Sequence, residues 1–347
     1  MVRDGNGVEA MDVGMVAGRR HHPSSTRWKL AAGAVALALA WLIVSPAFVQ
    51  SSDQVAFRAA GDRVLQKPED GRARALQDLP FARLSEVAYE RAPGIQADRP
   101  AVCPDPVSSL EQHWKKWPGF PADDSLFHDY HLRVEAWSTS DGVVSDDLAN
   151  ENSRPGIAVA FGGTDAKYIE DWVADFRWFI PFHNDQYTQI IEKVAPQFAE
   201  TFSRLSARPD WAYIQKAVLY TTGHSLGGGL AQQFAYAVPR APGVPRVRHV
   251  YAFDPSPVTG YYSVKDTALR DENVKTLRID RIYQRDEVLA GVRTALAIVY
   301  PPKKAEPAIE GVRYSLFRGN IVRRHSISQL ACRLSDLASG VKPGREP

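Results

Sequence analysis

Cysteine is scarce in this chain, and its scarcity limits the possible chemistry. The 347 residues contain only two cysteines, Cys103 and Cys332. No cysteine pair has the spacing of a zinc site, so no metal is expected, and nothing else in the sequence calls for an organic cofactor. The two thiols would form one disulfide in an exported protein or stay as two buried free thiols. The sequence leaves these alternatives open.

An excess of charge of one sign is also missing. The chain has 42 basic and 40 acidic residues, a net charge of +2. This balance gives no polyelectrolyte signature, so nucleic acid is not an expected partner. Internal repeats and long low-complexity tracts are absent from the sequence as well. The composition is that of a folded protein with room for one large domain or two ordinary ones.

Charge disappears altogether from residues 30–49, LAAGAVALALAWLIVSPAFV, which follow a leader (1–29) that ends in several basic residues. Twenty residues suffice to cross a bilayer, so we expect an N-terminal transmembrane signal anchor. The basic leader would then stay in the cytoplasm, with the rest of the chain on the extracytoplasmic side. A signal peptide cleaved after Ala47, giving a secreted protein, is the alternative.

After this segment the chain separates into a charged linker with a short helix, 50–79, and a folded domain, 80–347. Within the domain, patterns typical of strands alternate with patterns typical of helices. This alternation predicts an α/β fold with a mostly parallel central sheet and helices on both faces. The expected strands lie near 131–139, 156–164, 216–222, 248–254, 274–283 and 312–318. The expected helices lie near 80–93 and 186–205, from 228 and from 327.

One stretch, VLYTTGHSLGGGLAQQ (218–233), places Ser225 between a predicted strand and a predicted helix, with Gly223 and Gly227 on either side. Strand, Gly-x-Ser-x-Gly and helix together form a nucleophile elbow, in which a tight turn lifts the serine hydroxyl off the sheet edge. The glycines lack the Cβ atoms that would collide across such a turn. Ser225 is therefore the predicted nucleophile.

A serine nucleophile needs a base and an acid that orients it, in the chain order Ser, Asp or Glu, His. After Ser225 the only histidines are His249 and His325. His325 follows the last predicted strand, where the base of such a site belongs. Asp286, at the end of a predicted strand, is preferred as the acid over Asp254, which ends the preceding strand.

Two other histidine positions receive simpler interpretations. His224, next to the nucleophile, is expected to pack rather than to act as a second base. The stretch HDYH, 128–131, is expected to be a solvated turn, because no set of carboxylates or cysteines accompanies it.

These motifs resemble the class 3 lipases of the fungal triacylglycerol-lipase type, an α/β-hydrolase family. The similar segments are TTGHSLGGGLAQQFAY, AFGGTDAKYIEDWVADF, RIYQRDEVLA and LSEVAYE, and the resemblance extends over about residues 80–337. It implies that Thr164 and the backbone N–H of Leu226 bind the oxyanion. Thr164 would also serve as a helix N-cap, which is the structural alternative.

The segment after Thr164 carries an apolar stripe at helical spacing that includes Trp172 and Phe176. One interpretation is a core helix. The other, which the position next to the oxyanion residue favours, is a lid that opens at a lipid surface and contacts substrate.

Together these features predict a serine hydrolase of carboxylic esters, with lipid acyl esters as its substrate class and the membrane as its partner. Ser225, His325 and Asp286 form the triad, and an acyl-enzyme is released by water. A thioesterase, amidase or peptidase with the same triad is one alternative. A non-catalytic, membrane-tethered binding module is the other, and the sequence does not determine the oligomeric state.

Overall fold

A computed structural model describes residues 55–59, 70–90, 103, 105–123, 125–142, 154–163, 186–256, 258–285, 287, 289, 307–320 and 323–341. By the distribution of internal contacts the chain divides into Met1–Phe48 and Val49–Pro347, and the described residues all belong to the second unit. None of the helices in these ranges has both the length and the hydropathy that crossing a bilayer requires. The leader and the expected anchor at 30–49 lie outside the described residues.

The described strands form one eight-stranded sheet in the order β1-β8-β7-β6-β5-β4-β3-β2. Neighbours from β4 to β8 run parallel, whereas β1, β3 and β2 pair antiparallel at the two edges. The expected mostly parallel sheet is therefore confirmed. The strands are β1 (Val55–Ala59), β2 (Lys115–Lys116), β3 (Val134–Thr139), β4 (Gly156–Phe161), β5 (Val218–His224), β6 (Val247–Phe253), β7 (Arg278–Gln284) and β8 (Ala308–Tyr314).

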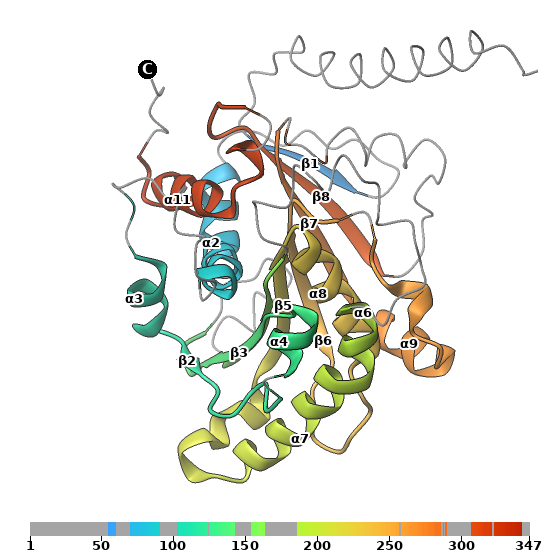
Figure 1. Cartoon of the computed structure of the whole chain (residues 1–347). Coiled ribbons are helices and arrows are strands. Elements are labelled where there is room, and N and C mark those ends of the chain that lie inside the picture. The colour runs from blue at the N-terminus through green and yellow to red at the C-terminus, as the bar shows by residue number, and fades with distance from the viewer. Residues whose placement is uncertain are drawn as a thin grey trace, which may run out of the picture. The chain divides into compact units, whose positions relative to one another are not determined.

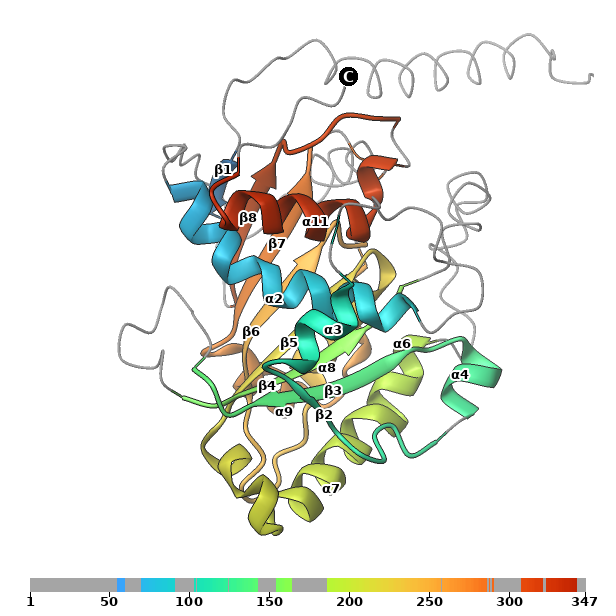
Figure 2. The ribbon, with the colours of Figure 1, turned by 90° about the vertical axis from the view of Figure 1, so that its left-hand side faces the viewer.

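Helices cover both faces of this sheet, as expected (Figure 1). One face carries α2 (Asp70–Glu90), α3 (Pro106–Glu111) and α11 (Ile327–Ala338), which lie together in the turned view of Figure 2. The other face carries α6 (Gln186–Gln189), α7 (Ala195–Ser206), α8 (Leu226–Ala237) and α9 (Thr267–Val274). Shorter elements are α4 (Ser125–Tyr130), a π-helical turn (Ile190–Val194) and 3-10 turns at Pro209–Lys216, Tyr261–Ser263 and Arg323–His325.

Strand β4 shows how the sheet separates two cores. Ile157, Val159 and Phe161 belong to the cluster under α7 and α8, whereas Ala158 and Ala160 belong to the cluster under α2 and α11. Successive side chains of a strand point to opposite faces, and here both faces are buried. A continuous apolar run is the sequence pattern of such a strand.

The segment expected to be a linker contributes to the sheet and to a helix. Strand β1 pairs with β8, and α2 begins at Asp70, ten residues before Pro80, and continues through that proline. The first turns of α2 are charged, but Arg74 is buried in ion pairs with Asp78 and Asp280. In the sequence, a segment rich in charged residues suggests a solvated linker even when its charges are buried and paired in the folded protein. For this reason the sequence analysis placed the start of the folded domain at residue 80, after the start of α2.

The two cysteines form a disulfide. Cys103, ahead of α3, is bonded to Cys332 in α11. Of the two alternatives left open by the sequence, the structure therefore has the disulfide.

Candidate active site

The turn at Ser225 has the geometry of a nucleophile elbow. Ser225 joins β5 to α8 with φ 57° and ψ −123°, a conformation that non-glycine residues rarely adopt and that is typical of functional sites. A Cβ on Gly223 would collide with the backbone of Gly227, and a Cβ on Gly227 would collide with the carbonyl of Phe161. The glycines are therefore required for the close approach of β4, β5 and α8.

The backbone around Ser225 is held from three sides. Its N–H donates to Phe253 O (2.9 Å), and its carbonyl accepts from Gly228 N (3.0 Å) and Ser256 N (2.9 Å). The side-chain Oγ is buried and has no hydrogen-bond partner among the described residues. Leu226 is the first residue of α8, so its N–H lies at the positive end of the helix dipole. This is the place where a developing oxyanion is best stabilised.

His325 lies in the 3-10 turn between β8 and α11, and a buried carboxylate orients its ring. Its Nδ1 is 2.8 Å from Oε2 of Glu287, which also accepts a hydrogen bond from Leu289 N at 2.7 Å. The His325 ring packs against that of His224, with ring centroids 4.6 Å apart. The predicted base is thus in contact with the residue that precedes the predicted nucleophile, and its Nε2 has no partner within the described ranges.

The carboxylate that contacts His325 is Glu287, which the sequence analysis did not select. Asp286, the acid preferred there, lies outside the described residues. The stretch RDEV contains two adjacent carboxylates, Asp286 and Glu287. This adjacency is the sequence feature from which Glu287 could have been considered as an alternative acid. Consecutive residues of an extended chain point in opposite directions, so the choice depends on the path of the chain after β7.

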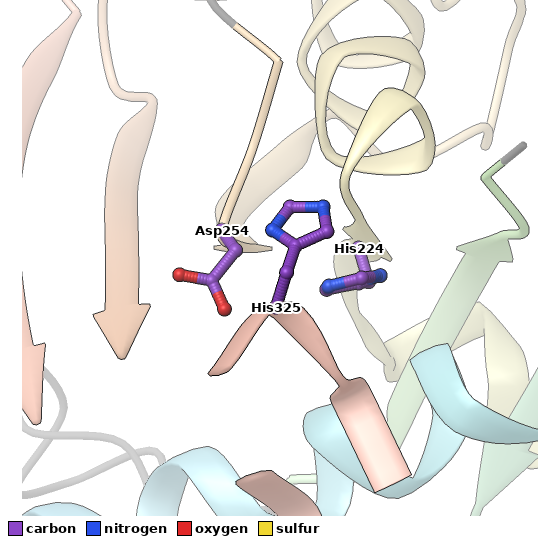
Figure 3. Close-up of side chains that lie close together, drawn as sticks. All are labelled: His224, Asp254 and His325. Carbon is purple, nitrogen blue, oxygen red and sulfur yellow. The ribbon is translucent and has the colours of Figure 1, made fainter. Parts of the chain in front are cut away.

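Asp254, the second acid candidate, lies close to the same histidine. It follows β6, is fully buried and has φ 38°, and its Oδ1 accepts a hydrogen bond from Gln284 N at 2.9 Å. Donor atoms of His224, Asp254 and His325 all lie within 4.8 Å of one another (Figure 3). His249, the other late histidine, lies away from this cluster in β6 and pairs with Asp280 through Nε2 (2.8 Å).

Tyr89, at the end of α2, fixes His224. Its hydroxyl lies 3.0 Å from His224 Nδ1 and donates to the His224 carbonyl oxygen, also at 3.0 Å. His224 is therefore a packed residue, as expected, and it is also part of a polar network. This network links α2 to the elbow.

Other predicted site residues cannot be placed. Thr164, Trp172 and Phe176 lie outside the described residues, so the oxyanion threonine and the lid stay predictions. The histidines at 128 and 131 are exposed, and neither belongs to a group of potential metal ligands in the described part of the chain.

Some known proteins are similar to this chain in structure or in sequence family. No curated protein sequence matches the chain. Among solved structures, the Rhizomucor miehei lipase–propeptide complex matches 69% of this chain and 67% of its own, with 16% identity and a TM-score of 0.35. A fungal lipase–inhibitor complex matches 67% of this chain and 76% of its own, with 18% identity and a TM-score of 0.33.

A family model also matches part of the chain. The model of the phospholipase-like family described as "Tle-like phospholipase domain" matches residues 81–243, a range that runs from α2 past α8 and contains Ser225. The resemblance to a lipase family is thus confirmed, and the chain is similar over these residues to Tle-like phospholipase domains.

Proposed function

We propose that this protein hydrolyses carboxylic esters of lipids, with Ser225 as nucleophile, His325 as base and Glu287 as the acid that orients the base. The observation that carries the proposal is the 2.8 Å contact between His325 Nδ1 and Glu287 Oε2, beside the elbow. A strained serine, a histidine and a buried carboxylate are the three groups that nucleophilic ester hydrolysis needs.

The protons balance in both halves of the reaction. Because Nδ1 of His325 donates to Glu287, Nε2 carries the lone pair that accepts the proton of Ser225 Oγ. Oγ bonds to the acyl carbon, and the carbonyl oxygen becomes an oxyanion beside the N-terminus of α8. The imidazolium then protonates the departing alcohol. In the second half, water gives one proton to His325 and attacks the acyl carbon, and the proton returns to Ser225.

The N–H of Leu226 is the proposed oxyanion donor. Its position at the start of α8 supports this role, since the four first N–H groups of a helix lack partners within the helix. Thr164 is the proposed second donor, on the resemblance alone. Two donors are the usual composition of an oxyanion hole, and each contributes about 10²–10³-fold to the rate.

The match to a phospholipase domain supports lipid esters as the substrate class. The disulfide between Cys103 and Cys332 supports an exported domain, because such bonds persist mainly in oxidising compartments. We therefore propose that the charge-free segment 30–49 directs the domain to the extracytoplasmic side of a membrane, as an anchor or as a cleaved signal.

The deciding experiment compares the wild type with Ser225→Ala on phosphatidylcholine vesicles and on soluble p-nitrophenyl esters, thioesters and anilides. We expect the esters and the phospholipid to be cleaved, and Ser225→Ala to lose turnover by ~10⁴–10⁶-fold. The catalytic groups act as a unit, so removing the nucleophile leaves only residual activity.

A fluorophosphonate probe supplies the control. It should label the wild type and leave Ser225→Ala unlabelled. A wild type that is folded, unlabelled and inactive on all the substrates would support a binding module instead.

A further inference from the structure

Tyr89, the penultimate residue of α2, reaches the residue that precedes the proposed nucleophile. Its side chain is buried. Its hydroxyl lies 3.0 Å from Nδ1 of His224 and donates to the His224 carbonyl oxygen, also at 3.0 Å. His224 directly precedes Ser225 in the chain. One hydroxyl therefore contacts both the ring and the backbone of the residue from which the elbow starts.

The same hydroxyl lies against the turn that follows β4. A Cβ built on Gly163 would collide with the Tyr89 hydroxyl oxygen and with the His224 carbonyl oxygen. Glycine is therefore required for these three groups to meet. Gly163 precedes Thr164, the proposed second oxyanion donor. The hydroxyl of Tyr89 thus lies where the elbow and the segment leading to the oxyanion threonine approach each other.

The main chain of Tyr89 is tied to this turn as well. Arg133 Nη1 donates a hydrogen bond to the Tyr89 carbonyl oxygen at 3.3 Å. The carbonyl oxygen of Arg133 in turn accepts a hydrogen bond from Gly162 N at 3.0 Å. Tyr89 is therefore connected to the turn after β4 through its backbone and to the elbow through its hydroxyl. The rigid aromatic ring between these two connections sets the separation of the two segments.

The His224 ring extends this connection to the proposed base. The ring centroids of Tyr89 and His224 are 5.5 Å apart, and those of His224 and His325 are 4.6 Å apart. Figure 3 shows the two histidine rings side by side. The contact of the Tyr89 hydroxyl at Nδ1 fixes the rotation of the His224 ring, because turning the ring would break it. The surface against which His325 packs is therefore held in one orientation.

We infer that Tyr89 is a positioning residue of the proposed ester hydrolysis, and that its hydroxyl holds Ser225 and His325 in place relative to the oxyanion segment. The inference rests on the proposed function. Tyr89 acts through the carbonyl and the ring of His224. A misplacement of about 1 Å in reacting groups lowers the rate by about 10²-fold, so a contact that fixes their relative position contributes to kcat.

Packing alone does not need the hydroxyl oxygen of Tyr89, because a phenylalanine ring would occupy the same space. Other contacts hold α2 on the sheet. Ser85 Oγ lies 2.8 Å from Thr222 Oγ1 of β5, and the ring of Phe81 stacks on that of Tyr251 with centroids 3.9 Å apart. Removing the hydroxyl should therefore leave the helix in place, so Tyr89→Phe isolates the positioning role.

The test compares Tyr89→Phe with the wild type on a soluble p-nitrophenyl ester. Active sites are counted by titration with the fluorophosphonate probe, so that a partly unfolded sample does not lower kcat. We expect kcat to fall by about 10–10²-fold because the reacting groups shift. KM should stay within about twofold of the wild-type value, since the hydroxyl acts on the geometry of the transition state.

Tyr314→Phe is the matched control, because it also removes one buried tyrosine hydroxyl that is bonded to α2. The Tyr314 hydroxyl donates to Asp78 Oδ2 at 2.8 Å, about three helical turns before Tyr89. This variant should lower the midpoint of thermal unfolding and leave kcat unchanged. Equal losses of kcat in the two variants would overturn the inference.

Gly163→Ala tests the same contact from the other side, and it decides the question if Tyr89→Phe does not fold. Its methyl group displaces the Tyr89 hydroxyl from His224, so kcat should fall here too. In the double variant the two losses should not multiply, because both changes disturb one separation. An unchanged kcat in Gly163→Ala, or fully multiplicative losses in the double variant, would overturn the inference.

The outcome for the wild type separates this inference from the proposed function. An active wild type with the same kcat in folded Tyr89→Phe would refute the positioning role alone. A wild type that neither hydrolyses the ester nor reacts with the probe would refute the proposed function, and the positioning role with it.

Discussion

At the residue scale, the adjacent acids Asp286 and Glu287 allow a direct test of which one orients the base. Glu287→Gln should lower kcat/KM by about 10⁴-fold, because an amide at this position favours the wrong tautomer of His325. Asp286→Asn is the matched control and should change the rate little. The measurement is steady-state hydrolysis of a soluble ester. A larger loss in Asp286→Asn would return the role to the residue that the sequence analysis preferred.

The same pair shows what the sequence can predict about single residues. The turn at Ser225 was predictable because the glycines and the surrounding pattern specify it locally. The place of His325 between the last strand and the last helix was predictable from the strand and helix patterns that flank it. The contact of Glu287 with His325 was not, since it depends on how the chain turns after β7 and on two segments 38 residues apart.

At the element scale, the elbow depends on the approach of α8 to β4. Gly227→Ala places a methyl group against the Phe161 carbonyl, a backbone atom that cannot move aside cheaply. We expect the serine to shift and kcat/KM to fall by about 10²-fold, since a displacement of about 1 Å has this effect. The protein should remain folded by circular dichroism.

Gly243→Ala is the control for this prediction, because it tests the effect of replacing a glycine where no collision occurs. Gly243 has φ +80°, and nothing lies within 4 Å of a Cβ built there. The alanine should lower the midpoint of thermal unfolding slightly, because of backbone strain, and leave kcat/KM unchanged. Equal losses of activity in the two variants would remove the argument for a steric requirement at the elbow.

Elements differ in how far they could be predicted. Strands β4 and β5 were recognisable because their apolar runs are buried on both faces. The start of α2 was not recognisable, because a charged residue there is paired with a residue far away in the sequence. Arg74 donates a hydrogen bond to Asp280 of β7, which lies 206 residues later in the chain. Tertiary ion pairs of this kind leave no local pattern.

At the scale of the whole molecule, a buried ion network joins the helix layer to the sheet. Asp280 of β7 contacts Arg74, Arg278 and His249, and Arg74 also pairs with Asp78. Burial alone raises the pKa of Asp280, but the attraction of His249 and of the two arginines outweighs it and holds this pKa well below its usual range. For Asp78, burial prevails and raises the pKa.

This network predicts an acid dependence of stability. A carboxyl whose pKa is depressed in the folded state stabilises the protein above its unfolded pKa, about 3.9 for aspartate, and this stability is lost as the pH falls further. The free energy of unfolding should therefore decrease below about pH 4. In Asp280→Asn this decrease should be smaller, while Asp78 contributes with the opposite sign in both proteins. Urea unfolding at a series of pH values measures the difference.

Asp210→Asn is the control for this experiment, because Asp210 forms an exposed pair with Arg208 at 2.8 Å. Exposed pairs contribute little, so its pH profile should follow the wild type. Equal acid profiles for the wild type and Asp280→Asn would show that the network does not account for acid sensitivity.

The disulfide has a topological consequence for the whole chain. Cys103 and Cys332 are 229 residues apart, and Ser225, Glu287 and His325 all lie between them. The bond therefore turns the stretch that carries these groups into a closed covalent ring. Hydrolysis of any single peptide bond within the ring opens it without dividing the molecule, so the proposed nucleophile, acid and base stay on one covalently continuous body.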